Sequence, residues 1–454
     1  MQAMGVPGRS AALFLPFRPA LRRIPGGMAH GLPHARRPLA GSFRVPPSKS
    51  VLQRALVLEA LAAEPGCLVA HDGTPALQAA PAHDVRDLAV ALGSLGRWQG
   101  GALGGSRASQ VLDLGLGATG FRLATALATL RPAGARTLVR GRPALLARPH
   151  RDIRRALSRL GGHVVRKPSG AHRVIAGGMR GGEVTLGAGS SSQHLSALML
   201  LAPRLGGLRI CLAGVAVSRP YLRVTAAALA AYGIGVALEG LDAPGGAITV
   251  QAGVPSAARL VVEPDASAAA FWWAAAALTG GVACVTGLPA DSLQADACLP
   301  RLLARMGATV TVGAGGEAEV RGPGGGLDAP GEVDLRDAPD LLPLVAVLAA
   351  FARGSTCLSG LAHARGKESD RVARSAGLLQ ALGVPAECGE AHLLVHGAPE
   401  AARPALLHAH GDHRLAFAAA LAGLRLPGCT LEGGASVAKS HPSFWPDLEH
   451  ATGH

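Results

Sequence analysis

Hydrophobic and polar positions along the chain repeat one pattern: an amphipathic helical stretch, a small turn at glycine, and a following run with the composition of a β-strand. The closing glycines are spaced 65 to 76 residues apart, at Gly96, Gly161, Gly233, Gly307, Gly383 and Gly453. Glycine after a helix supplies the left-handed backbone conformation that ends it. A period of about 70 residues is too long for a solenoid repeat, so the pattern predicts six α/β units.

Each unit has room for several helices and strands. In one of them, the periodicity predicts helices at residues 83–96, 119–131 and 149–161, and strands at residues 110–114 and 136–140. Six units of this kind fit an arrangement of two lobes with three units in each.

A new apolar stretch, LVVEPDASAAAFWWAAAALTGG, begins at residue 260 and is typical of the start of a fourth unit. We therefore expect residues 48–260 to form one lobe, and residues 38–47 together with 261–454 to form the other. Clefts between lobes favour ligands, so we expect the active site there.

The composition excludes several classes of protein. The chain has 454 residues, of which 49% are hydrophobic and only 3% aromatic. No uninterrupted apolar run reaches the roughly 18 residues of a membrane span. The seven cysteines are scattered without a CxxC pair, and HExxH is absent. This pattern is typical of reduced thiols in the cytosol, and we expect a cytoplasmic protein without a metal site.

The formal net charge is +14, and residues 1–37 contribute six arginines and no acidic residue to it. We interpret this segment as a disordered extension, or as sequence upstream of a true start at Met28. An excess of basic over acidic residues is typical of proteins that bind nucleic acid and of proteins that bind a small anionic substrate. The motifs distinguish between the two.

Lysine is rare enough in this chain to be informative. Only Lys49, Lys167, Lys367 and Lys439 occur, beside 40 arginines, and asparagine is absent. A lysine ammonium is a compact charge that can release a proton, which a guanidinium effectively cannot. Lys49 lies between two serines at the start of a predicted helix, 50–63. Either an ammonium is needed there, or the lysine is a remnant of a biased composition.

Polar and charged residues recur at predicted helix starts, where free N–H groups and the helix dipole attract anions. Ser50 precedes Arg54 by one turn, and Asp340 stands just ahead of a long apolar helix. A serine or aspartate at such a position also has a plainer interpretation as an N-cap. The further candidates are Arg148, Ser191, Ser192, Gln193, Ser218, Lys367, Glu368, Arg371, Arg414 and Lys439.

The pattern as a whole is more specific than any single motif. If both lobes direct helix starts into one cleft, seven cations meet there, and the candidate carboxylates Asp340 and Glu368 cannot balance them. One ion pair at 4 Å contributes about 4 kcal/mol at an effective dielectric of 20, so the cluster requires multiply charged ligands. We expect one or two phosphorylated or carboxylated substrates. The seven cations are Lys49, Arg54, Arg148, Lys367, Arg371, Arg414 and Lys439.

Six segments resemble the 3-phosphoshikimate 1-carboxyvinyltransferase (EPSP synthase) family, in order from about residue 39 to 450: PPSKSVLQRALVLEALA, AHDVRDLAVALGSLG, SSQHLSALMLLAP, GKESDR, DHR and AKSHPSFW. Each is weak alone, but the ordered set is very specific. The resemblance implies a two-lobed inverted α/β barrel of the enolpyruvyl transferase type, with three α/β units in each lobe. It also implies a cytoplasmic monomer without cofactor, active in aromatic amino-acid biosynthesis. Its reaction would transfer the enolpyruvyl group of phosphoenolpyruvate to the 5-hydroxyl of shikimate 3-phosphate and release phosphate.

The matched motifs also imply roles for individual residues. Asp340 would accept the proton of the attacking hydroxyl, and Glu368 and Lys49 would transfer protons at the phosphoenolpyruvate methylene. The implied contacts of shikimate 3-phosphate are Lys49, Ser50, Arg54, Ser191, Ser192, Gln193, Ser218, Asp340, His363 and Lys367. The implied contacts of phosphoenolpyruvate are Lys49, Ala118, Arg148, Gln193, Arg371, Arg414 and Lys439.

The chain departs from the family pattern in its Gly-rich turn, Gly115-Leu116-Gly117-Ala118-Thr119. Leu116 replaces an asparagine, which puts a polar contact near phosphoenolpyruvate in doubt. Ala118 adds a methyl group, as in the glyphosate-tolerant branch of the family, and predicts weakened glyphosate binding. His363 stands where an asparagine often contacts the substrate.

Three alternatives are open at this point. The sister enzyme that acts on UDP-N-acetylglucosamine shares the fold but usually carries a reactive cysteine on a Gly-rich loop, and the matching region contains no such loop. A protein that binds nucleic acid would interleave aromatic residues with its arginines, whereas aromatics make up only 3%. An inactive paralogue, disabled through Leu116, would not release phosphate. We expect neither a nucleic acid nor a membrane as a partner.

Overall fold

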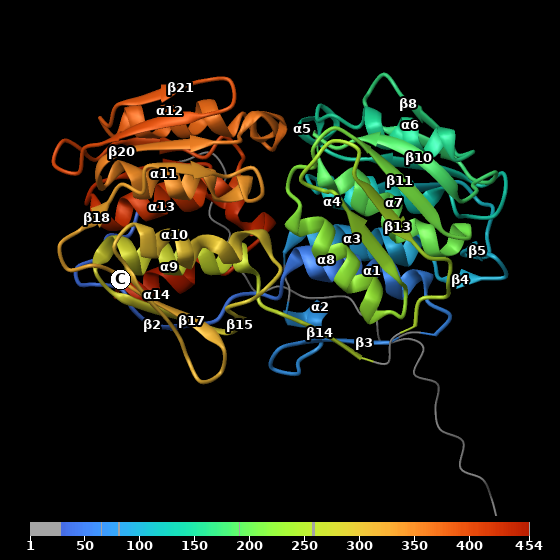
Figure 1. The fold of residues 1–454 in the computed structure, drawn as a ribbon, viewed down its shortest axis with the longest axis horizontal. Helices are drawn as coiled ribbons and strands as arrows, with labels where there is room; N and C mark the ends of the chain where they lie inside the picture. Colours follow the sequence, from blue (N-terminus) through green and yellow to red (C-terminus); the bar gives the residue numbers. More distant parts are fainter. Residues whose placement is uncertain (1–28, 65, 80–81, 190, 257–258, 454) are drawn as a thin grey trace, which may run out of the picture.

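The computed structural model describes residues 29–64, 66–79, 82–189, 191–256 and 259–453. They form two α/β halves that lie side by side, the first in blue to green and the second mainly in yellow to red (Figure 1). Strand β2, in blue, lies in the second half. The prediction for residues 1–28, including a start at Met28, falls outside the described residues.

Four sheets share one topology, in which a parallel pair of strands is followed by two antiparallel strands. In the first half, one sheet consists of β6 (Gln110–Asp113), β7 (Arg136–Arg140), β9 (His172–Ile175) and β8 (His163–Arg166). The other sheet of this half consists of β10 (Gly182–Gly187), β11 (Leu208–Ala213), β13 (Ala247–Val250) and β12 (Val236–Glu239). In the second half, the first of these sheets consists of β2 (Ala40–Phe43), β15 (Val282–Pro289), β17 (Glu317–Arg321) and β16 (Thr309–Val312). In the second sheet of this half, β18 (Leu327–Asp328) and β19 (Glu332–Asp334) both pair with β20 (Ala352–Ser359), which is followed by β22 (Leu393–Gly397) and β21 (Ala386–Cys388).

Two smaller sheets complete the six units. In the first half, β3 (Cys67–Ala70) pairs in parallel with β14 (Arg259–Val262). In the second half, β23 (Leu406–His408) pairs in parallel with β24 (Thr430–Glu432). A short hairpin, β4 (Trp98–Gln99) and β5 (Ala102–Leu103), adds to the first unit. The predicted two-lobed fold of six α/β units is confirmed.

Three buried helices form the centre of each half and pack against one another. Nearly every residue of these helices is buried, so they lack the polar face of a surface helix. They are α1 (Lys49–Leu61), α4 (Ala118–Ala128) and α7 (Ser192–Leu201) in the first half, and α9 (Ala266–Thr279), α11 (Leu342–Ala350) and α13 (His413–Arg425) in the second. The other α-helices are α2 (Ala76–Ala79), α3 (His83–Leu95), α5 (Pro143–Leu146), α6 (Arg151–Arg159), α8 (Pro220–Ala231), α10 (Leu299–Arg305), α12 (Arg371–Ala381) and α14 (Phe444–Thr452).

The repeating glycines end helices as the pattern predicts. All six have positive φ angles, between 73° and 97°, a region that favours glycine because it has no Cβ. Predicted helices 83–96 and 119–131 form as α3 and α4, and predicted strands 110–114 and 136–140 form as β6 and β7. The third predicted helix, α6, begins later than residue 149, because Pro149 and His150 stand outside it.

The two halves meet at two chain crossings that run side by side. The backbone N–H of Ser48 donates to the carbonyl of Glu263 (2.8 Å), and that of Asp265 donates to the carbonyl of Pro46 (2.8 Å). Buried apolar residues form one cluster on each side of these crossings. We propose that the lobes divide there, close to the predicted boundaries at residues 48 and 260.

The prediction of a disordered extension is wrong for residues 29–37. There, β1 (His30–Gly31) pairs antiparallel with β24, and Leu32 is buried in the core of the second half. The backbone N–H of Leu32 donates to the carbonyl of Cys429 (2.9 Å). Sequence periodicity missed this pairing because the segment is short and its partner strand lies about 400 residues away in the chain, a separation that local patterns do not register.

Two buried histidines give the first half a dependence on pH. The rings of His150 and His172 pack against Phe121 of α4, with centroids 4.6 and 4.7 Å away, and Thr125 Oγ1 lies 3.1 Å from His172 Nδ1. Burial is the largest cause that lowers the pKa of each histidine, to about 3. Both rings are therefore neutral in the folded protein across the physiological range.

We expect the free energy of unfolding to fall as the pH drops below about 6.5, because unfolded histidines take up protons there and the buried ones do not. The contribution of the two neutral histidines to the free energy of unfolding is complete above about pH 6.5 and is lost progressively toward about pH 3. Each histidine contributes a slope of up to about 1.4 kcal/mol per pH unit. Urea unfolding at pH 7 and pH 5 measures the effect. His172→Gln, which cannot titrate, should reduce the slope, and an unchanged slope would contradict the assignment.

Candidate active site

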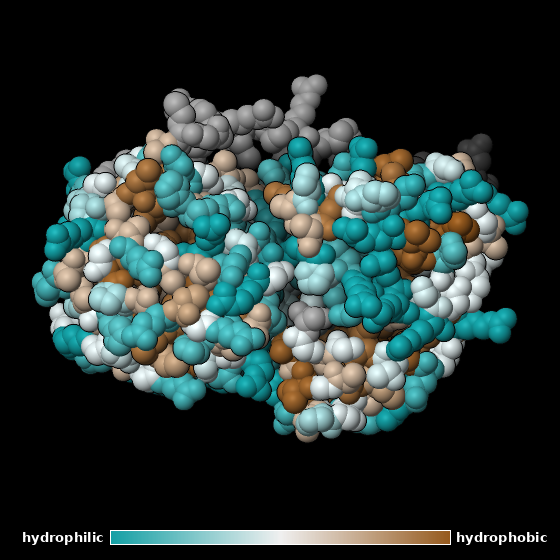
Figure 2. Space-filling view, turned by 90° about the horizontal axis from the view of Figure 1, so that it is seen from above, coloured by the Kyte–Doolittle hydropathy of each residue, from teal (hydrophilic) through white to brown (hydrophobic). Residues whose placement is uncertain are grey.

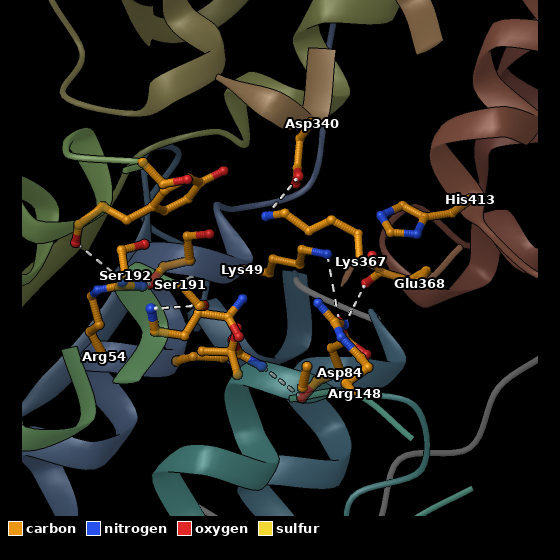
Figure 3. A pocket seen from close by; sticks show the side chains of 17 residues that line it. Lys49, Arg54, Asp84, Arg148, Ser191, Ser192, Asp340, Lys367, Glu368 and His413 are labelled. Carbon is orange, nitrogen blue, oxygen red and sulfur yellow. Dashed lines mark hydrogen bonds and ion pairs between the residues drawn. The ribbon is translucent and has the colours of Figure 1, made fainter. Parts of the chain in front are cut away.

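The starts of the central helices from both halves meet in one pocket (Figure 3). In the first half, α1 begins at Lys49, and α7 is capped by Ser191, whose Oγ accepts from the N–H of Gln193 (3.3 Å). In the second half, Asp412 caps α13 and accepts from the N–H of Arg414 (2.9 Å). The predicted convergence of helix starts from both lobes is therefore present in the structure.

The structure decides two of the capping questions that the sequence left open. Ser48, not Ser50, caps α1, since its Oγ accepts from the N–H of Val51 (3.4 Å). Asp340 caps no helix. It lies in a single 3-10 turn before α11, and Figure 3 shows its carboxylate directed toward the Lys367 ammonium.

Most of the predicted site residues line this pocket. These are Lys49, Ser50, Arg54, Ala118, Arg148, Ser191, Ser192, Gln193, Ser218, Asp340, Lys367 and Glu368. His363 reaches the pocket indirectly, with its Nε2 3.4 Å from Ser218 Oγ. Arg371 and Arg414 lie behind the residues that line the pocket and pair with its carboxylates. Lys439 lines an adjoining cavity and pairs with Glu368.

Arg371 is the centre of this ionic network. Its side chain is only 1% exposed. It donates from Nε to Asp412 Oδ2 (2.8 Å), from Nη1 to Asp340 Oδ1 (2.6 Å) and from Nη2 to Glu368 Oε2 (2.8 Å). One guanidinium thus holds three carboxylates in fixed positions, Asp412 fully buried and Asp340 and Glu368 partly exposed to the pocket. Bonds of this kind are stronger than neutral hydrogen bonds.

Ion pairs also cross between the two halves. Arg148 of the first half lies 3.3 Å from Glu368 of the second, and Lys439 of the second half lies 4.0 Å from Asp84 of the first. Lys439 also contacts Glu368, and Asp84 lies 3.6 Å from Lys49. The charges from both halves therefore form a single network across the pocket.

The expectation that only Asp340 and Glu368 face the cations is wrong. Asp84 and Asp412 add two more carboxylates, both buried. The segments AHDVR and DHR each contain one of these aspartates next to a predicted helix start. That position was the available signal, but an aspartate there is usually an N-cap, so its second role in charge compensation was not evident.

The network sets the protonation of the two predicted catalytic carboxyls. Burial alone would raise the pKa of Asp340, but Arg371, Lys367 and Arg414 lower it well below its usual value. Burial would likewise raise the pKa of Glu368, and Lys439, Arg148 and Arg371 lower it well below its usual value. Both are therefore ionised in the free protein.

Burial lowers the pKa of Lys367, and only part of that effect is offset by Asp340. Lys439 behaves differently, because Asp84 and Glu368 outweigh the effect of burial and raise its pKa. Of these two lysines, Lys367 is therefore the one that gives up a proton more readily.

Two further arginines, one in the pocket wall and one beside it, form no ion pair with a carboxylate in the described part of the chain. Arg54 is buried, and it donates to Thr225 Oγ1 (2.7 Å), Ser196 Oγ (3.1 Å) and the carbonyls of Ser50 (2.6 Å) and Tyr221 (3.2 Å), all neutral. Burial lowers its pKa to about 10. A buried cation held only by neutral groups is unfavourable unless an anion binds to it.

Arg122 is the second of these arginines, and it was not among the predicted site residues. It donates to Ser191 Oγ (3.3 Å), to Gln193 Oε1 and to the carbonyl of Pro149 (3.0 Å). Burial lowers its pKa well below the usual value, and Arg148 lowers it further. Arg122 thus orients the side chains of Ser191 and Gln193 toward the pocket.

His413 also lines the pocket and was missed as a site residue. It is buried, and neither ring nitrogen has a hydrogen-bond partner within the described structure. Burial is the largest cause that lowers its pKa well below the usual value, followed by Lys49. Its neighbour in the sequence, Arg414, was predicted as a site residue and indicated that this helix start faces the site.

No cysteine is among the residues that line the pocket. Within the described residues, no group of three histidines, cysteines or carboxylates is suited to hold a metal ion. Also within them, no helix is both long enough and apolar enough to cross a membrane.

Comparison with known proteins identifies the family. The family model for EPSP synthase (3-phosphoshikimate 1-carboxyvinyltransferase) matches residues 33–448. The chain belongs to the EPSP synthase family. It is 35% identical, over 430 residues, to a 3-phosphoshikimate 1-carboxyvinyltransferase of Syntrophobacter fumaroxidans, with 91% of this chain and 98% of the relative covered. It is 36% identical, over 424 residues, to a 3-phosphoshikimate 1-carboxyvinyltransferase of Halobacterium salinarum, with 90% of this chain and 95% of the relative covered.

Solved structures show the same fold at lower sequence identity. An EPSP synthase from Acinetobacter baumannii superposes with a TM-score of 0.73 at 23% identity, covering 93% of this chain and 98% of that one. The enolpyruvyl transferase NikO from Streptomyces tendae superposes with a TM-score of 0.69 at 20% identity, covering 94% of this chain and 98% of that one. The fold of the EPSP synthase family is thus shared by enzymes that differ widely in sequence.

Proposed function

We propose that the protein transfers the enolpyruvyl group of phosphoenolpyruvate to the 5-hydroxyl of shikimate 3-phosphate and releases phosphate. The observation that carries this proposal is a single pocket between the halves that combines anion-binding cations from both with an ionised carboxylate, Asp340. Family membership supports the choice of substrates, because the relatives are named for this reaction. We further propose that the enzyme is a cytoplasmic monomer.

We place shikimate 3-phosphate beside α1 and α7. Arg54, which has only neutral partners, suits its phosphate together with the helix starts at Ser50 and Ser192. Lys367 and Asp340, 3.6 Å apart, face this region from the other half. The substrate would then be held by both halves, with its 5-hydroxyl next to Asp340.

We place phosphoenolpyruvate at the other end of the pocket, between Arg148 and Lys439. In the free protein these cations pair with Glu368, so the substrate anions must compete with this carboxylate for them. The Arg371 and Arg414 guanidiniums stand directly behind Asp340 and Glu368. They reach the substrate only if these carboxylates shift, and we propose that binding causes this shift.

The proposed reaction is an addition followed by an elimination. The 5-hydroxyl oxygen forms a bond to C2 of phosphoenolpyruvate, its proton passes to Asp340, and the C3 methylene takes a proton from Lys49 to become a methyl group. The tetrahedral intermediate then loses phosphate from C2 and a methyl proton from C3, which restores the double bond. Glu368 is ionised in the free site, so it suits proton removal in the second step, and Lys49 suits proton donation in the first.

A coupled phosphate-release assay tests the function. We expect release only when both shikimate 3-phosphate and phosphoenolpyruvate are present, with the enol ether as the second product. Lys49→Ala should abolish the release. Release from UDP-N-acetylglucosamine and phosphoenolpyruvate, or none from either pair, would favour the sister activity or an inactive paralogue.

Ala118 predicts tolerance to glyphosate. Its methyl group lies in the pocket wall at the first residue of α4, beside the proposed phosphoenolpyruvate position, where it narrows the space for a bulkier inhibitor. We expect Ala118→Gly to lower the inhibition constant of glyphosate about tenfold or more, which corresponds to about 1.4 kcal/mol. Steady-state inhibition against phosphoenolpyruvate measures it. Equal inhibition of both forms would refute the steric explanation.

A further inference from the structure

The basic surface of one α/β unit is not explained by the pocket alone. Residues 136–180 contain eleven arginines and Lys167 against one acidic residue, Asp152, which gives +11 of the chain's net charge of +14. Residues 1–37 contribute +6, so the remainder of the chain has a net charge of −3. A generally basic composition therefore does not account for this unit.

Most arginines of this unit are exposed, and they are crowded together. Arg151, Arg155 and Arg159 are exposed and follow one another at four-residue spacing on α6, so they share a face of the helix, where like charges are destabilising. The pKa of Arg154 is lowered by burial and then by the nearby Arg166, Arg151 and Arg155. The arrangement opposes folding rather than supporting it, which favours a functional explanation.

Some exposed or half-exposed arginines elsewhere in the protein are paired with acidic side chains. Arg353 pairs with Asp328 (2.7 Å), and Arg365 pairs with Asp370 (2.6 Å). Such pairs cancel the surface charge locally. In the unit of residues 136–180, Arg140 pairs with Asp113 (3.0 Å) and Arg148 with Glu368 (3.3 Å). The other ten basic side chains share one acidic residue of the unit, Asp152, so the surface keeps a strong positive potential.

This surface leads directly to the active site. Arg148, in the pocket wall, is separated from α6 only by Pro149 and His150. Arg140 and Arg142 line an adjoining open cavity of about 640 Å³, whose wall includes Asp84 of the pocket and Lys439. Seen from above, hydrophilic side chains gather over the middle of the first half, with hydrophobic ones above and below them (Figure 2).

We propose that the basic surface of residues 136–180 is an encounter surface, which collects the multiply charged substrate anions and guides them to Arg148. This inference rests on the proposed function, because shikimate 3-phosphate and phosphoenolpyruvate each carry a phosphate and a carboxylate. A cleft lined by one sign of charge raises association rates by about 10- to 1,000-fold. The effect raises the rate at which substrates bind and leaves the rate of the chemical step unchanged. Salt weakens it, since the Debye length is about 10 Å at an ionic strength of 0.1 M.

The test removes surface charge without touching the pocket. The triple variant Arg151→Gln, Arg155→Gln, Arg166→Gln changes three exposed side chains on α6 and β8. We expect kcat/KM for both substrates to fall about 3- to 10-fold at low ionic strength, while kcat stays unchanged. The difference from the wild type should disappear near 0.5 M salt, where screening is strong.

A matched triple variant removes the same charge from the other half. Arg301→Gln, Arg403→Gln, Arg425→Gln alters three exposed arginines on or beside α10, α12 and α13, and we expect its kcat/KM to stay close to that of the wild type. An equal decrease in both triple variants, or none in either, would overturn the encounter surface. Failure of the wild type to release phosphate would instead overturn the proposed function, and the inference with it.

Discussion

Asp340→Asn is expected to lower kcat by about 10²- to 10⁴-fold, the range that a general base contributes. The substituted amide would keep the shape of the side chain but cannot accept the proton of the attacking hydroxyl. The pKa of Asp340 lies well below its usual value, so the wild-type carboxylate is available as a base throughout the neutral range. Phosphate release at saturating concentrations of both substrates measures the change.

The control for this variant lies in the same segment of the chain. Asp334→Asn changes an exposed aspartate that pairs with Arg336 at 3.6 Å, outside the pocket, and should leave kcat within about twofold of the wild type. Thermal unfolding of both variants checks that each is folded. A folded Asp340→Asn variant with a kcat within tenfold of the wild type would refute the role of Asp340 as the base.

Arg371→Met is expected to destabilise the protein by about 3–5 kcal/mol, because it leaves buried carboxylates without their shared cation. Asp412, with no solvent exposure, loses its closest cationic partner, and Asp340 and Glu368 each lose one of several. Methionine is close to arginine in length, so loss of charge rather than a cavity dominates the effect. Urea unfolding at pH 7 measures the free energy.

The same helix provides the control for Arg371. Arg374 is one turn further along α12 and exposed, and Arg374→Met should change the free energy of unfolding by no more than about 0.5 kcal/mol. A similar small effect for Arg371→Met would show that the network of Arg371 contributes little to the stability of the fold.

Local patterns predicted much of this architecture because each repeat carries its own start and stop signals. The glycines that close the helices, such as Gly96 and Gly161, need positive φ angles and mark every unit. The backbone contacts of β1 with β24 escaped prediction. These contacts join segments far apart in the chain, and periodicity describes only neighbours.

The candidate site was predictable where a motif placed charge at a helix start. Lys49, Arg148 and Asp340 were found in this way, and all three line the pocket. Arg122 was overlooked because it lies inside a helix, where its contacts with Ser191 and Gln193 depend on the packing of α4 against α7. The compensating charges of Asp84 and Asp412 were hidden for the same reason, since ion pairing is a property of the folded arrangement.

We propose that cations from both halves bind the same phosphoenolpyruvate molecule. The most direct measurement is the KM for phosphoenolpyruvate, at saturating shikimate 3-phosphate, of Arg148→Gln from the first half and Arg414→Gln from the second. We expect each variant to raise this KM about tenfold or more, since each loses a charged hydrogen bond to the same anion. A rise in only one variant, with the other folded and unchanged, would contradict it.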